Sequence, residues 1–95
     1  MPSKQHPYII TAGNPDRAVV FGWSSKKLKP GDVATLTKAR MVLYWPSECQ
    51  GLFGLAANGP KKGTKLTPAL VSTSTPVVRT LEMTADIGQL MDGWP

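Results

Sequence analysis

Turn-forming residues divide this chain into short segments, and that division limits what it can fold into. Nine glycines and nine prolines occur among its 95 residues, and pairs such as Asn14-Pro15 and Pro30-Gly31 are strong turn signals. The runs between these signals are short and rich in β-branched and aromatic residues, which is typical of strands. The sequence therefore predicts a β-rich domain with short connections.

We expect five or six strands in these runs. The third run alternates polar and apolar residues up to Thr37, and after Lys38-Ala39 it either continues or bends to pair with itself. The expected strands cover residues 7–11, 17–23, 33–37 with 39–45, 69–75 and 77–83.

Two short helices complete the predicted fold. Ser47 is expected to cap a helix over residues 48–58 that ends at Gly59, and Thr84 is expected to cap a helix over residues 85–91. The expected fold class is α+β: a small, mostly antiparallel sheet or partial barrel of five to six strands, with one short helix across it and a short C-terminal helix.

A single domain over residues 1–95 is expected, with residues 1–6 flexible. A domain of this size has little core in which to bury the apolar segment Gly51–Ala57 and the pair Met91 and Trp94. We therefore expect these residues to be exposed and the protein to form a homo-oligomer.

The chain is basic, with 11 Lys and Arg residues against six Asp and Glu residues and a net charge of +5. This excess favours phosphate-bearing partners such as nucleic acid, nucleotides or an anionic surface, although a need for solubility also explains it. Cys49 is the only cysteine, which excludes an intramolecular disulfide and fits a reducing cytoplasm. Neither a membrane-spanning run nor a signal-peptide pattern is present, so a soluble intracellular protein without a membrane partner is expected.

Residues suited to catalysis are sparse. His6, the only histidine, is expected to be solvated near the N-terminus, and Cys49 to be a small buried residue rather than a nucleophile. One histidine and one cysteine cannot form a zinc site within one chain. The segment Gly59–Lys65 lacks the spacing of a nucleotide-binding phosphate loop. We therefore expect that the protein is not an enzyme and that it has no catalytic residue, metal site or cofactor.

A basic loop is the first candidate for ligand binding. Three lysines surround Gly63, whose backbone can approach a phosphate closely because it has no side chain. The candidate ligand-binding residues of this loop are Lys61, Lys62, Gly63, Thr64 and Lys65.

Arg40 and Tyr44 are the second candidate for ligand binding. Alternation along a strand places these two side chains on one face, and Met41, Leu43 and Trp45 on the other, where they would join the core. An arginine beside an exposed aromatic ring can hold a phosphate and stack on a base.

A purely structural role for these two residues is the alternative. Tyr44 would then cover the sheet, and Arg40 would pair with Glu48 or Glu82.

Several short motifs resemble a family of small uncharacterised proteins of tailed phages and prophages. The similarity extends over most of residues 8–92, from "AVVFGW" through "ARMVLYW" to "VVRTLEMTADIGQL". Met41 stands where that family has a second arginine. The residues that match the family pattern are Ala39, Arg40, Trp45, Leu52, Leu55, Ala56, Gly59, Pro68 and Thr84.

This resemblance implies a phage protein that acts in the host bacterial cytoplasm. Small basic phage proteins without enzymatic activity suggest counter-defence, and the expected function is a sponge that sequesters the cyclic di- or trinucleotide signals of immunity systems such as CBASS. A basic chain suits an anionic ligand better than it suits mimicry of nucleic acid. The alternatives are a single-stranded nucleic-acid binding module, a phage protein that inhibits a defence protein by direct binding, and a structural phage protein without a ligand.

Overall fold

The computed structural model describes residues 5–12 and 18–95, which form an α+β fold, as predicted. Six strands and two α-helices occur in this part of the chain, together with one short 3-10 helix, η1. The strands are β1 (His6–Thr11), β2 (Val19–Ser24), β3 (Val33–Tyr44), β4 (Lys65–Leu66), β5 (Leu70–Pro76) and β6 (Arg79–Glu82). The helical elements are η1 (Ser47–Cys49), α1 (Gly51–Asn58) and α2 (Ala85–Asp92).

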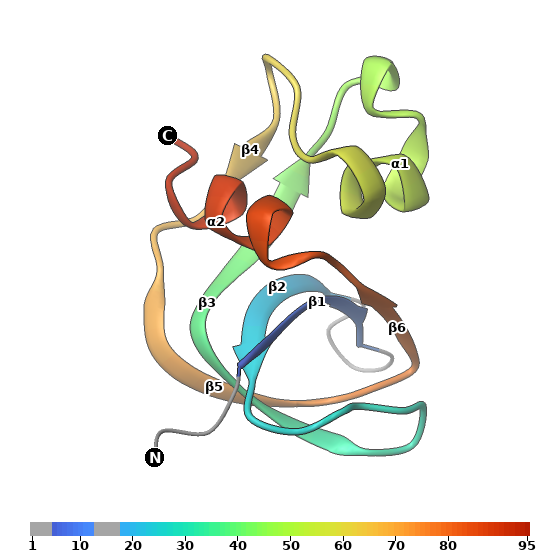
Figure 1. The fold of residues 1–95 in the computed structure, drawn as a ribbon, viewed down its shortest axis with the longest axis vertical. Coiled ribbons are helices and arrows are strands. Elements are labelled where there is room, and N and C mark those ends of the chain that lie inside the picture. The colour runs from blue at the N-terminus through green and yellow to red at the C-terminus, as the bar shows by residue number, and fades with distance from the viewer. Residues whose placement is uncertain (1–4, 13–17) are drawn as a thin grey trace.

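All strand pairs described are antiparallel, and the main path of the sheet runs β4-β3-β2-β1-β6. The long strand β3 organises this sheet. Its first part, Val33–Ala39, pairs with β5, whereas its last residues pair with β4, so that β5 and β4 follow one another along the edge opposite β2. The sheet curls, and α1 and α2 lie together at one end of the molecule, above β1, β2 and β5 (Figure 1).

The curled sheet separates two apolar clusters. One contains Ile9, Phe21 and residues of both helices, including Leu55 and Met91. The other lies against the opposite face of the sheet and contains Ile10 and residues such as Tyr8, Leu36 and Ala39. Because neighbouring residues of a strand point to opposite faces, β1 supplies side chains to both clusters.

Helix α2 packs directly on the sheet. The Thr84 side chain accepts a hydrogen bond from the Ile87 amide at 3.3 Å, so the predicted N-cap is confirmed. Gly88 faces Trp23, and a Cβ atom at this position would lie 2.8 Å from the Trp23 ring and 2.7 Å from the Pro7 side chain. A glycine is therefore required for α2 to lie this close to β1 and β2.

Several local predictions are corrected. Ser47 does not cap a long helix, because Gln50, at φ 62°, separates η1 from α1, and neither helix has a side-chain cap. Met91, a residue of α2, was expected to be exposed but is fully buried, and Leu55 and Ala56 of the segment Gly51–Ala57 are buried as well. His6 begins strand β1 instead of lying in a flexible segment. Residues 1–4, the turn at Asn14-Pro15 and the predicted start of the second strand at Arg17 lie outside the described residues.

The predicted faces of β3 are also wrong. Arg40 is buried, whereas Met41 and Leu43 are 42% and 58% exposed. The physical reason is that β3 passes between the two clusters and changes conformation at Lys38, which has a left-handed φ of 53°. Ala39 consequently joins one cluster and Arg40 turns toward α2. Trp45 does pack, as expected, against the cluster that contains Phe21 and Leu55, which we call the helix-side cluster.

Candidate functional site

The end of β3, the basic loop and β4 together form a basic tip, which we define as Tyr44 and Lys61–Lys65. Tyr44 and Lys65 are partners across the β3–β4 ladder, at a register shift that follows the Val42–Leu66 pair, so the two residues are neighbours at the end of the sheet. Tyr44 is 53% exposed, and Lys65 is exposed beside it. The structure therefore brings together an accessible aromatic ring and the predicted lysine loop.

Thr64 holds the loop of the tip in shape. Its hydroxyl group donates to the Lys61 carbonyl at 2.7 Å and accepts from the Lys61 amide at 3.2 Å. The Thr64 carbonyl accepts from the Trp94 indole at 2.8 Å, and its hydroxyl lies 3.6 Å from the Cys49 sulfur. Because Thr64 is buried and its hydroxyl proton is used by Lys61, we assign it an anchoring role.

The remaining loop residues face solvent. Lys61, Lys62 and Gly63 are exposed. Gly63 has a backbone φ of 100°, which residues other than glycine rarely adopt. No salt bridge involves these lysines within the described residues. The tip thus presents uncompensated positive charge, which attracts phosphate groups, next to a ring on which a base can stack.

Arg40 lies away from the tip. Its Nε atom donates to the Thr67 carbonyl at 2.7 Å, and its Nη1 atom donates to the carbonyls of Met91 and Asp92 at 2.7 and 3.3 Å. The Met91 and Asp92 carbonyls belong to the last turn of α2, where a cation is favourable. Arg40 therefore joins α2 to the segment after β4, and it pairs with neither Glu48 nor Glu82.

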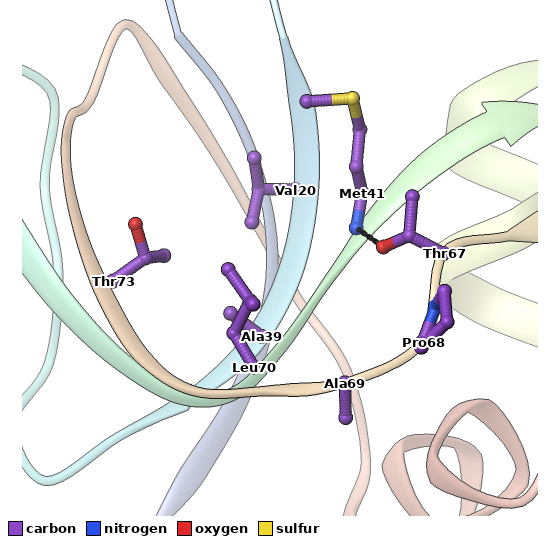
Figure 2. A pocket seen from close by; sticks show the side chains of 8 residues that line it. All are labelled: Val20, Ala39, Met41, Thr67, Pro68, Ala69, Leu70 and Thr73. Carbon is purple, nitrogen blue, oxygen red and sulfur yellow. Dashed lines mark hydrogen bonds between the residues drawn. The ribbon is translucent and has the colours of Figure 1, made fainter.

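An apolar cavity of about 430 Å³ lies beside the first residues of β5. In Figure 2, Val20, Ala39 and Leu70 lie around this space, and the Met41 amide donates to the Thr67 hydroxyl at 2.9 Å. No charged side chain of residues 5–12 or 18–95 lines the cavity. Its mostly apolar walls suit an uncharged group better than a phosphate.

Sequence reasoning missed a polar cluster at the end of α2. The Trp23 indole donates to both carboxylate oxygens of Asp92, at 3.0 and 3.1 Å. One signal was available in the sequence, since Asp92 directly follows the predicted helix over residues 85–91, where an acidic residue opposes the helix dipole. The other half of this cluster arises from tertiary structure, because β2 and α2 are far apart in the chain.

None of the helices in the described part of the chain is long and apolar enough to span a membrane. Comparisons with curated proteins and with solved structures found no match. A family model described as a domain of unknown function (DUF6948) matches residues 7–89, from β1 to within α2. The chain therefore belongs to the DUF6948 family.

Proposed function

We propose that this protein binds single-stranded nucleic acid through the basic tip. The observation that carries the proposal is the pairing of exposed Tyr44 with Lys65, next to the exposed Lys61 and Lys62. Single strands are bound by such a combination of stacking rings and positive charge along the backbone. The net charge of +5 adds a long-range attraction for the same ligand.

The shape of the tip favours an extended ligand. None of the three cavities described in this chain is lined by Tyr44 or by a tip lysine. A compact cyclic nucleotide is held best in a concave site that surrounds it. A protruding tip instead contacts a strand that continues past it on both sides.

The binding assay should use a single-stranded DNA of about 20 nucleotides at several salt concentrations. Changing Lys61, Lys62 and Lys65 to alanine should weaken binding and reduce the salt slope by about 2, since each lost phosphate contact changes it by about 0.7. A matched variant removes three exposed charges elsewhere, through Lys26→Ala, Lys29→Ala and Arg79→Ala. Equal loss in both variants would show that total charge, and not the tip, determines binding.

A counter-defence sponge for cyclic oligonucleotides is the second candidate, and with it a phage origin and action in a bacterial host. It is supported by exposed apolar residues, including Leu43 beside Tyr44 and Phe53 in α1, at 58% and 63%. If these residues pair two copies of the chain, the tips can enclose a compact ligand between them. This function therefore requires a homo-oligomer.

Light scattering and a competition assay separate the two candidates. A sponge should be oligomeric at about 50 µM, a concentration at which micromolar association is complete, and should bind a cyclic dinucleotide more tightly than the linear strand. A monomer that prefers the linear strand supports the first candidate. A protein that binds neither ligand would contradict both proposals.

A further inference from the structure

A second cavity, which is polar and has a volume of about 250 Å³, lies between β3 and the end of α2. We call it the α2 pocket. Its residues come from four segments that are distant in sequence: the start of the described chain, β2, β3 and α2. They are Gln5, Trp23, Thr37, Lys38, Gln89 and Asp92.

The Asp92 carboxylate marks one side of the α2 pocket. Among the described residues, both of its oxygens accept from a single donor, the Trp23 indole, although a carboxylate offers about four lone-pair sites. Asp92 and Trp23 are both half-buried. The carboxylate is therefore fixed in position but still open to a further donor.

Asp92 also occupies an unfavourable place in its helix. It is the last residue of α2, where the helix dipole favours positive charge, and the last turn of α2 contains no basic residue. Arg40 bonds the main-chain carbonyls there, but it forms no salt bridge with the carboxylate within the described residues. Since Arg40 already occupies the helix end, the carboxylate is the group that would stabilise a positively charged ligand beside Asp92.

Lys38 marks the other side and is also placed unfavourably. Its φ of 53° lies in the left-handed region, which non-glycine residues seldom occupy and which costs energy when they do. The side chain is exposed and has no salt-bridge partner within the described part of the chain. Strained residues of this kind gather at functional sites.

A neighbouring cavity contains a lysine and a glutamate that form a salt bridge. It shares Gln5 with the α2 pocket, and in it Lys27 and Glu82 contact each other at 2.6 Å. Lys38 and Asp92 line one cavity without such a contact. The α2 pocket therefore keeps one positive and one negative group apart, each open to a ligand.

We propose that the α2 pocket binds a small zwitterion of the amino-acid class, whose ammonium group donates to Asp92 and whose carboxylate accepts from Lys38. The exposed amides of Gln5 and Gln89 are available for further hydrogen bonds at the rim. The volume is smaller than the roughly 300–1,000 Å³ of pockets that take drug-sized ligands, which limits the ligand to about ten heavy atoms. This site is independent of the basic tip.

The Trp23 indole reports on this site directly, because its N–H group is bonded to Asp92. The ¹H–¹⁵N resonance of this indole can be followed by NMR and assigned with Trp23→Phe. The probes are glycine, 4-aminobutyrate and 6-aminohexanoate, each tested up to about 10 mM, above the Kd of about 1 mM that so small a ligand can reach. At least one zwitterion should shift the indole resonance, and butyrate and butylammonium should bind about tenfold more weakly, because each lacks one charge-assisted hydrogen bond.

Two variants test the two charges separately. Asp92→Asn keeps a carbonyl oxygen for the Trp23 indole, and Lys38→Asn introduces a residue that tolerates the left-handed conformation. Each should weaken the best zwitterion about tenfold, whereas Lys38→Arg should retain binding. The matched control Lys27→Asn removes the same charge from the neighbouring cavity and should leave binding unchanged.

The proposal is overturned if no probe shifts the indole resonance, or if butylammonium binds as tightly as the zwitterions. It is also overturned if Lys38→Asn binds normally, a result that can be read even where Asp92→Asn fails to fold. Loss of the three tip lysines should not affect this titration. Failure of the tip to bind nucleic acid therefore leaves the test of the α2 pocket intact.

Discussion

The basic tip and the α2 pocket are both polar, yet their backbones are built differently. In the tip the left-handed position is occupied by Gly63, and the lysines stand on a loop that Thr64 holds with regular hydrogen bonds. In the α2 pocket a left-handed position is occupied by Lys38, and an acidic residue ends a helix. The tip follows the local preferences of its residues, and the α2 pocket opposes them.

This difference separates two ways of presenting charge. Exposed lysines on an unstrained loop cost little, so they are explained by solubility as well as by function. A strained lysine and a carboxylate at a helix C-terminus both reduce stability, and conflicts of this kind are concentrated at functional sites. The following predictions test the contrast, beginning with the largest effect.

Arg40→Met should have the largest effect on stability. The substitution leaves the Thr67, Met91 and Asp92 carbonyls without the guanidinium donors, and we expect the free energy of unfolding to fall by about 3–5 kcal/mol. Urea denaturation measures this change. Arg79→Met is the control, since Arg79 is exposed and its guanidinium lies over the Phe53 ring at 5.7 Å, so its loss should cost about 1 kcal/mol or less. Equal losses would mean that Arg40 does not fasten α2.

Trp45→Ala and Tyr44→Ala should separate packing from binding. Trp45 packs against the helix-side cluster, so its removal should cost about 3 kcal/mol through the cavity that remains. Tyr44 is 53% exposed, and Tyr44→Ala should leave the melting temperature nearly unchanged while weakening single-stranded DNA about tenfold to a hundredfold, the value of one stacked base. Thermal melts with and without DNA test both variants. A large loss of stability in Tyr44→Ala would place that ring in the core.

An exchange of backbone preferences tests the contrast itself. Gly63→Ala forces a side chain into a backbone conformation at φ 100° and should cost about 1–2 kcal/mol. Lys38→Gly relieves the left-handed strain and should increase the free energy of unfolding by about 0.5–1 kcal/mol, because the relief exceeds the added entropy of the unfolded chain. Chemical denaturation should show a lower free energy of unfolding for Gly63→Ala and a higher one for Lys38→Gly. Destabilisation by Lys38→Gly would show that Lys38 is not strained.

The order of five of the strands and of both α-helices could be predicted because it depends on local signals, whereas β4 lies in the segment that was predicted to be a basic loop. Turn residues separated the strands, and Thr84 marked the start of α2. The faces of β3 could not be predicted, since simple alternation assumes one buried side, whereas this strand serves two clusters and changes conformation at Lys38. The lysines of the tip were visible in the sequence, but the pairing of Trp23 with Asp92 depends on residues 69 positions apart.

The smallest predicted effect concerns the ion pair between Lys27 and Glu82 in the neighbouring cavity. This paired lysine is compared with Lys38, which has no salt-bridge partner among the described residues of the α2 pocket. The hydrogen bond from Lys27 to Glu82 raises the pKa of Lys27 above its ordinary value of 10.5. A raised pKa means that the pair stabilises the fold fully below pH 10.5 and loses this contribution as the pH rises through the folded-state value. Glu82→Gln should therefore lower the melting temperature slightly at about pH 9, and this effect should disappear as the pH rises through the folded-state pKa of Lys27. The effect stays small because Lys27 is exposed and solvent screens the pair. Lys38→Asn should show no such pH-dependent loss, and a loss of the same size would mean that Lys38 is paired in solution and that the two cavities do not differ.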